Sequence, residues 1–408
     1  MNTEHSHQWR FWPVILLSIL YPMNINMIGW AIPIYFFRRA VATELIGLLT
    51  AGSTITYTVS PIIFSKISDK IPRKTGIIIA MVGTLLTQLI FYITLQPIPF
   101  LIARLCEGFI VGIFWTNLQA SISDNIYHQH RKLTALYNFS WNMGLVLGLI
   151  VGAILTFFIE DLTIIFYSAP IFLVINVVIA VFGFQEPYKN TLAEPSKTSH
   201  HDISQEDVLN SSRQKNGLLL ENIEFPYYYP FLLVMLYSLT RGVINFIFPI
   251  KSEVLGFDTY TVYIASIFFM LTQSIAIIGA SSISLKHLKF FNVVIIIPLF
   301  ITTLFFGLNT NYLIFIILFL ILGSCTGMLF GISLRLVLIL NIKHNRSIYS
   351  AILESFTGIF YLIGPILAGY LSYINLDLSL YVLSLISGAI WIVLITLSWK
   401  RLKIINDI

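Results

Sequence analysis

Long apolar blocks alternate with short polar segments along nearly the whole chain. Each block holds roughly twenty residues, which is the length that an α-helix needs to cross about 30 Å of hydrocarbon. Inside lipid every backbone N–H and C=O must be satisfied within the protein, so blocks of this length predict helices. A transmembrane barrel would show alternating strands of about ten residues, and the sequence has no such pattern. We therefore predict an all-α membrane protein.

The pattern predicts twelve spans, six in each half of the chain. In the first half the predicted spans cover residues 14–36, 44–64, 76–95, 100–121, 133–159 and 162–184. In the second half they cover residues 229–250, 261–283, 291–308, 312–334, 347–373 and 378–399. No small-residue cleavage site follows the first span, so we expect a retained helix and not a signal peptide.

The polar segment 185–225 separates the two sets of spans. It is rich in charge, Ser, Asn and His, and it has no apolar run long enough to cross a membrane. We interpret it as a cytoplasmic linker between an N-terminal six-helix bundle, residues 1–184, and a C-terminal six-helix bundle, residues 226–408.

The two halves look like diverged copies of each other. Pro33 and Pro249 are 216 residues apart, and so are Gly148 and Gly364. Further matches recur at almost the same spacing in the second and fourth spans. A collinear series of this kind indicates a parallel repeat of two pseudo-symmetric bundles.

Composition and charge support the same interpretation. The chain is 57% hydrophobic and only 11% charged, whereas about a quarter of a soluble domain is charged. With a cytoplasmic N-terminus, the basic residues gather in the inside loops: Lys66, Lys70, Arg73, Lys74, Arg131, Lys132, Lys286, Lys289, Lys343, Arg346, Lys400, Arg401 and Lys403. The outside loops then hold only Arg38, Arg39 and Lys251. This asymmetry predicts a multi-pass protein of the cell membrane with both termini cytoplasmic. The net charge of +5 therefore reflects membrane topology and does not indicate nucleic-acid binding.

The loop between the second and third spans carries a recognisable motif. Residues 65–74 are S-K-I-S-D-K-I-P-R-K, with Asp69, Lys70, Arg73 and Lys74 at the positions of the signature G-x-x-x-D-[RK]-x-G-[RK]-[RK]. That signature belongs to the major facilitator superfamily, and the chain resembles this family although Ser and Pro replace the two glycines. The fourth span adds Arg104-x-x-Glu107-Gly108, which is similar to the family's R-x-x-Q-G element.

The resemblance implies a secondary transporter that works by alternating access. Two bundles would rock about a central site lined by the first, fourth, seventh and tenth helices. Asp69 would then form a latch with basic residues such as Arg131 on the cytoplasmic side. The alternative is that these charges only fix the orientation of the loop.

Charges within the predicted spans cost roughly 3 kcal/mol near a helix centre, and so they indicate partners or function. Arg104 and Glu107 are three residues apart, so they form either a structural pair or a proton-coupling site at Glu107. Arg241 has no acidic residue within a turn, and it would face water, a carboxylate on another helix or an anionic substrate. Glu354 is that distant partner or a second proton-coupling candidate.

Polar and aromatic residues in the spans supply candidates for the substrate cavity. The set comprises Asn26, Trp30, Arg104, Asn117, Arg241 and Asn245. The amides could equally hydrogen-bond between helices, and the aromatic rings could simply fill space. Small residues at a spacing of four predict close helix packing: Gly108, Gly112, Gly144, Gly148 and Gly152, with Gly364-Pro365 in the eleventh span. In the family the Gly144 face meets the partner half.

These features predict a carrier for a small solute, proton-coupled in one hypothesis through Glu107 or Glu354. A hydrophobic exporter suits the aromatic cavity, whereas uptake of a carboxylate or phosphorylated solute suits Arg241. The sequence has no metal-ligand spacing, nucleotide-binding loop or catalytic motif, so we expect no cofactor, no metal and no enzyme activity. We expect a monomer in the lipid bilayer. The alternative function is a non-transporting sensor or scaffold on the same fold.

Overall fold

The computed structural model describes residues 10–68, 70–124, 130–186, 223–283, 288–344, 348–398 and 403–404. The first half contains α1 Trp12–Arg38, α2 Thr43–Tyr57, α3 Ser60–Ser68, α4 Arg73–Phe91, α5 Pro97–Asp124, α6 His130–Phe158 and α7 Thr163–Val178, which continues as the π-helix η1 Ile179–Gly183. The second half contains α9 Tyr229–Val254, α10 Thr259–Ser282, α11 Leu288–Leu308, α12 Tyr312–His344, α13 Ile348–Ile374 and α14 Leu378–Val393, which continues as η3 Leu394–Ser398. The predicted all-α class is confirmed.

Eleven of the described helical segments are long and apolar enough to cross a bilayer, and Val294–Leu308 of α11 is a shorter apolar helix. The predicted second span differs from the structure, because a turn at Thr58 and Val59 divides it into α2 and α3. Pro61 explains the break, since it has no N–H to donate to the carbonyl of Tyr57, where α2 ends.

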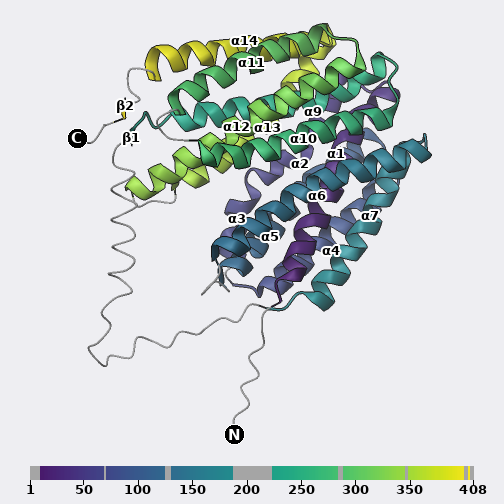
Figure 1. Cartoon of the computed structure of the whole chain (residues 1–408). Coiled ribbons are helices and arrows are strands. Elements are labelled where there is room, and N and C mark those ends of the chain that lie inside the picture. Colours follow the sequence, from purple (N-terminus) through teal and green to yellow (C-terminus); the bar gives the residue numbers. More distant parts are fainter. Residues whose placement is uncertain are drawn as a thin grey trace, which may run out of the picture.

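Successive membrane-spanning helices run in opposite directions, so the helix ends gather on two faces of the molecule (Figure 1). We call the face where α1 and α9 begin the terminal face. It also carries the only two strands of the described residues, Ile223–Glu224 (β1) and Lys403–Ile404 (β2), which pair antiparallel. We call the opposite face, where α1 and α9 end, the hairpin face.

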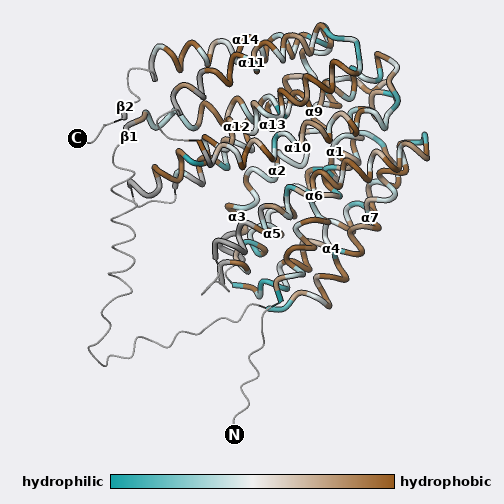
Figure 2. The backbone as a smooth tube through the Cα atoms, viewed as in Figure 1, coloured by the Kyte–Doolittle hydropathy of each residue, from teal (hydrophilic) through white to brown (hydrophobic). Residues whose placement is uncertain are grey.

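Hydrophobic residues predominate along the helices, whereas hydrophilic residues gather at several of the connections (Figure 2). Phe158 and Phe182 are large apolar residues with 76% and 83% of their surface exposed. Exposed apolar surface along every outer helix would be unstable in water, and a bilayer covers it.

The two halves touch mainly near the hairpin face. α2 packs on α13, α6 on α10, and α1 on α9. A Cβ on Gly47 of α2 would lie 2.5 Å from the carbonyl oxygen of Pro365, so only glycine permits this crossing. The hydroxyl of Tyr263 in α10 donates to the carbonyl of Met27 in α1 at 3.0 Å. The structure is therefore closed toward the hairpin face.

Candidate functional site

Arg104 and Glu107 form a buried ion pair inside the first half. Both side chains lie on α5, and Arg104 Nη1 is 2.5 Å from Glu107 Oε2. Their side chains are only 5% and 4% exposed. Arg104 Nη2 also donates to the hydroxyl of Ser53 in α2 at 2.6 Å. A separation of three residues on a helix places the two charges on one face, and the pair balances charges that neither residue could carry alone in lipid.

Three further side chains complete a polar network around Glu107. Its Oε1 accepts from the Tyr92 hydroxyl at 2.8 Å and from Gln88 Nε2 at 2.9 Å. Gln88 Nε2 also donates to Asn24 Oδ1 at 3.1 Å, and Asn24 in turn donates to the carbonyl of Ala169 in α7. The network therefore joins α1, α2, α4, α5 and α7 within one half.

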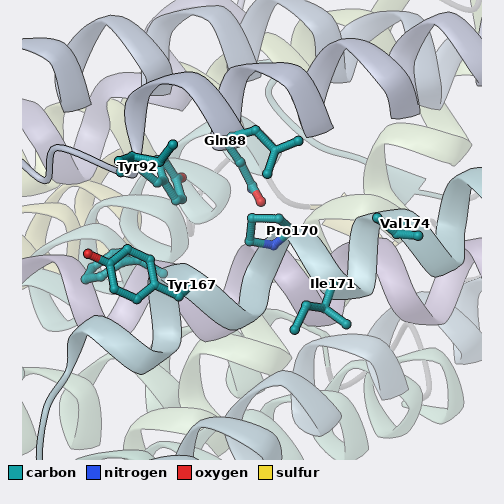
Figure 3. A pocket seen from close by; sticks show the side chains of 9 residues that line it. Gln88, Tyr92, Tyr167, Pro170, Ile171 and Val174 are labelled. Carbon is teal, nitrogen blue, oxygen red and sulfur yellow. The ribbon is translucent and has the colours of Figure 1, made fainter.

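The outer edge of this network meets a groove between α4 and α7, shown in Figure 3. The groove has a volume of about 260 Å³ and is lined by apolar residues with Gln88 and Tyr92 at its polar end. The amide oxygen of Gln88 points toward Pro170 (Figure 3) and has no hydrogen-bond partner. The groove opens on the outside of the bundle, because Ile93 and Ile171 on its walls are exposed.

A second polar cluster lies in the other half, and we call its members Tyr237, Arg241, Asn245 and Tyr361 the arginine cluster. The first three lie at intervals of four along α9, so they share one helix face. Arg241 Nη1 donates to the Tyr237 hydroxyl at 3.0 Å, and the guanidinium lies 5.7 Å from the ring centroid of Tyr361. Asn245 Nδ2 is 2.7 Å from the Tyr361 hydroxyl.

The arginine cluster has hydrogen-bonding capacity that the described protein does not use. Arg241 Nε and Asn245 Oδ1 are buried and have no partner. Arg241 Nη2 meets only the sulfur of Met270, at 3.9 Å. Among the described residues, no carboxylate forms an ion pair with Arg241. An unpaired guanidinium within a membrane span is costly, so it marks a place where another group is expected.

Glu354 does not pair with Arg241 but faces the other half. Glu354 is exposed, and its carboxylate lies near the phenol groups of Tyr57 and Tyr137 of the first half. Gly358, one turn further along α13, faces Thr58 of the first half, where an added Cβ would lie 3.3 Å from the Thr58 hydroxyl. Glu354 therefore faces the other half, whereas Glu107 is buried inside the first bundle.

The remaining cavity candidates are buried among the helices of the first half. Asn26 Nδ2 donates to the carbonyl of Leu145 in α6 at 2.7 Å. Asn117 donates to the carbonyl of Ile113 at 2.8 Å, and its amide lies against Gly76 of α4. Trp30 is buried, and its Nε1 has no partner. The structure therefore brings Arg241 and Asn245 together, whereas Arg104 lies in the separate network of the first half.

The loop motif is only partly within the described residues. Asp69 lies outside them, as does the side chain of Arg131, so the proposed latch between these two stays a prediction. Lys70 is exposed. The backbone N–H groups of Arg73 and Lys74 donate to the carboxylate of Glu186 at 2.6 and 2.8 Å, at the start of α4. A carboxylate at a helix N-terminus is stabilising, and no spacing in the sequence pointed to Glu186.

The glycine series packs in two directions. Gly108 and Gly112 of α5 lie against α2 and α3, at Ser53 and Ser60. Gly144 and Gly148 lie against the backbone of α1 in their own half, at Ile19 and Met23. The family expectation that this face meets the partner half applies only to Gly152, which contacts Tyr263 of α10.

Gly364 belongs to a second glycine contact, between α9 and α13. A Cβ on Gly364 would lie 2.8 Å from the backbone of Gly242, and Pro365, the next residue along α13, also contacts this glycine. The pair lies beside Arg241, so close packing holds α13 and its Tyr361 against the arginine cluster.

Two ion pairs near the hairpin face were not predicted from the sequence. Arg38 binds Glu253 through both Nε and Nη2, each at 2.7 Å, and its Nη2 also donates to Thr259 at 2.7 Å. Arg38 belongs to the first half and Glu253 to the second, so this pair joins the halves. Lys251 pairs with Asp377 at 2.7 Å within the second half. Partners more than a hundred residues apart leave no pattern in the sequence.

Comparison with protein families gives one match, described as the Major Facilitator Superfamily, over residues 14–340. No curated protein sequence matches the chain.

Solved structures share the fold at low sequence identity. An aspartate-to-alanine variant of the nucleoside transporter NupG has a TM-score of 0.71 and 14% identity, covering 94% of this chain and 98% of that one. A bacterial homologue of the human lysosomal transporter Spinster, in an inward-facing and occupied conformation, has a TM-score of 0.75 and 10% identity, covering 96% of this chain and 97% of that one. At these identities the likeness shows the fold alone.

Proposed function

Because this chain belongs to the Major Facilitator Superfamily and is a secondary transporter, we propose that its solute binds at the arginine cluster and that the two halves rock about it. Carriers of this fold bind their solutes near the bilayer midplane, between two bundles that move as rigid bodies. The observation that carries the proposal is the unused hydrogen-bonding capacity of Arg241 and Asn245 in the middle of α9. Such groups need a partner when the site is closed to water.

The moving units of this proposal are residues 1–184 and 226–408, joined by the linker 185–225. The protein acts as a monomer in the bilayer, and transport without chemical conversion of the solute is its only activity. The terminal face lies in the cytoplasm of a cell-membrane protein. Supporting this orientation, Lys70, Arg73 and Lys74 all lie at the terminal face, as the positive-inside rule requires.

Glu354 is the residue that we assign to proton coupling. A coupling carboxylate must exchange protons with water in one state and lose that contact in the other. Glu354 is exposed and lies near Tyr57 and Tyr137 of the opposite half, and Gly358, one turn further along α13, faces Thr58 of that half, so rocking of the halves changes the surroundings of Glu354. Glu107 is a weaker candidate, because it is paired with Arg104 and three hydrogen-bonding neighbours of its own half, Gln88, Tyr92 and Ser53, surround the ion pair.

Distances between spin labels would test this proposal without a known solute. One pair replaces Arg39 and Val254 with Cys at the hairpin face, and the other replaces Lys70 and Phe290 at the terminal face, all exposed positions. Both pairs are made after Cys106→Ser and Cys325→Ser. We expect two populations, in which a short distance at one face accompanies a long distance at the other. Acidic pH should change their ratio in the wild type but not in Glu354→Gln. One fixed distance at each face under all conditions contradicts rocking and favours a scaffold.

A further inference from the structure

Arg38 binds the carboxylate of Glu253 through two parallel hydrogen bonds. Its Nε and Nη2 form one edge of the guanidinium, and each donates to a separate oxygen of Glu253 at 2.7 Å. This two-point geometry is the strong form of arginine–carboxylate recognition. Arg38 therefore gives an internal standard for a satisfied Nε/Nη2 edge.

The same edge of Arg241 is unsatisfied. Its Nε has no partner, and its Nη2 meets only the Met270 sulfur at 3.9 Å, which is a weak acceptor at a long distance. The opposite nitrogen, Nη1, is held by the Tyr237 hydroxyl at 3.0 Å. The side chain is thus fixed on one side and open on the other. A methionine side chain is flexible, so Met270 can move aside when a ligand enters.

A second unused atom lies one helical turn away. Asn245 Oδ1 is buried without a partner, whereas Asn245 Nδ2 is 2.7 Å from the Tyr361 hydroxyl. Residues four apart on a helix have their Cβ atoms about 6 Å apart on the same face. The free edge of Arg241 is a double donor with positive charge, and the free oxygen of Asn245 is an acceptor. A ligand that binds both groups therefore needs an anionic acceptor at one end and a hydrogen-bond donor at the other.

Aromatic rings surround the two polar ends. Tyr361 lies under the guanidinium, and Tyr237 packs on Phe330 with ring centroids 4.8 Å apart. These rings favour a flat or apolar body between the polar groups of the ligand.

We infer that the solute of this transporter is a small organic anion with an apolar or aromatic body, whose carboxylate binds the Nε/Nη2 edge of Arg241 and whose hydroxyl or N–H donates to Asn245 Oδ1. This inference rests on the proposed binding site at the arginine cluster. To that proposal it adds the negative charge of the solute and the position of the solute's hydrogen-bond donor. Neutral ring compounds, such as the nucleosides named for one structural neighbour, can donate to Asn245 and offer a carbonyl to Arg241, but they carry no negative charge to balance the guanidinium.

Four probes separate the two contacts: 4-hydroxyphenylacetate, phenylacetate, 4-hydroxyphenylacetamide and uridine. Binding is measured as the ligand-dependent rise in unfolding temperature of the purified full chain. We expect 4-hydroxyphenylacetate to bind most tightly, phenylacetate several-fold more weakly, and the two neutral compounds about tenfold or more weakly, because a hydrogen bond to a charged group is the stronger of the two. Equal binding of the acid and its amide overturns the inference.

Substitutions assign each contact to its residue. Arg241→Gln should remove the preference for the acid over the amide, and Asn245→Leu should remove the preference for the hydroxylated over the plain acid. Arg241→Lys, which keeps the charge and the fold, should weaken acid binding but retain a preference over the amide, because lysine lacks the two-point edge. Arg335→Gln is the matched control, since Arg335 lies on α12 and donates to the carbonyl of Ile283.

The outcomes distinguish this inference from the proposed function. In one outcome the spin-label distances show the two expected populations, while Arg241→Gln binds the acid as well as the wild type does. In that case the inferred solute class is wrong and the carrier mechanism stands. If uridine binds best and Asn245→Leu abolishes its binding, the site is correct but the anion is not its ligand. If the distances are fixed while the acid binds through Arg241, the site is a receptor and the transport mechanism is wrong.

Discussion

At the residue scale, Arg104 and Arg241, which both lie within membrane spans, have opposite surroundings. Arg104 is neutralised by Glu107 on the same helix at 2.5 Å, whereas Arg241 has aromatic neighbours and no carboxylate among the described residues. Removing one member of a buried pair leaves an uncompensated charge, which costs more than the pair itself contributes. The Arg104–Glu107 pair should therefore matter for stability, whereas Arg241 should matter for binding.

Glu107→Gln tests whether this carboxylate is structural. The substitution leaves the Arg104 guanidinium buried without its counter-charge, so we expect a loss of about 3–5 kcal/mol in the free energy of unfolding. Thermal unfolding in detergent would measure it. The double variant Arg104→Met/Glu107→Leu should recover much of the loss, because it removes both charges together. If Glu107→Gln is as stable as the wild type but changes the spin-label distances as acidic pH does, Glu107 is a proton-coupling site instead.

The sequence predicted this pair but not its neighbours. A separation of three residues on one helix places Arg104 and Glu107 together whatever the rest of the fold does. Gln88 and Tyr92 around this pair come from the helix before it, as Tyr361 beside Arg241 comes from another helix than α9, and these contacts depend on how each helix is rotated about its axis. The repeated apolar composition of the spans leaves that rotation undetermined. The isolation of Arg241 was predicted for its own helix, and only the structure shows that the described residues of neighbouring helices form no ion pair with it either.

At the element scale, the crossing of α2 and α13 depends on the absence of side chains. Gly47 meets the backbone of Pro365, and Gly369 lies against the backbone of Thr43 and Gly47. The sequence predicted the ends of most helices within a few residues, because apolar length and flanking charges fix them. It did not predict the turn between α2 and α3 or which glycines touch the other half, since both depend on packing.

Gly47→Ala should open the hairpin face. The added Cβ would lie 2.5 Å from the backbone oxygen of Pro365, which cannot move without shifting α13. Overpacking of this kind costs about 1–3 kcal/mol, so the state closed at the hairpin face should lose about fivefold or more of its population. The spin-label pair at the hairpin face would report longer distances. Gly279→Ala is the control, because nothing lies within 4 Å of its added Cβ. Equal distances in both variants would show that this contact does not determine closure.

At the scale of the whole molecule, contacts between the halves gather near the hairpin face. The Arg38–Glu253 pair, the α2–α13 crossing and the bond from Tyr263 to Met27 all lie there. Of these, only the ion pair is exposed enough to respond to salt, with 40% of the Arg38 side chain accessible. A carrier must break its closing contacts in every cycle, so weak contacts suit this position better than strong ones.

The Arg38–Glu253 pair should bias the equilibrium without holding the fold together. Exposed ion pairs contribute about 0.2–1 kcal/mol, so Arg38→Gln should reduce the population closed at the hairpin face by up to about fivefold and leave the unfolding temperature nearly unchanged. High ionic strength should produce the same shift in the wild type and none in the variant.

Lys251→Met is the control, because Lys251 pairs with Asp377 inside one half. It should lower the unfolding temperature and leave the distances between the halves unchanged. The exchange Arg38→Glu/Glu253→Arg should restore closure, since attraction between the halves returns with reversed polarity. If the exchange behaves like Arg38→Gln, the closing force comes from the apolar and glycine contacts alone, and the ion pair only accompanies them.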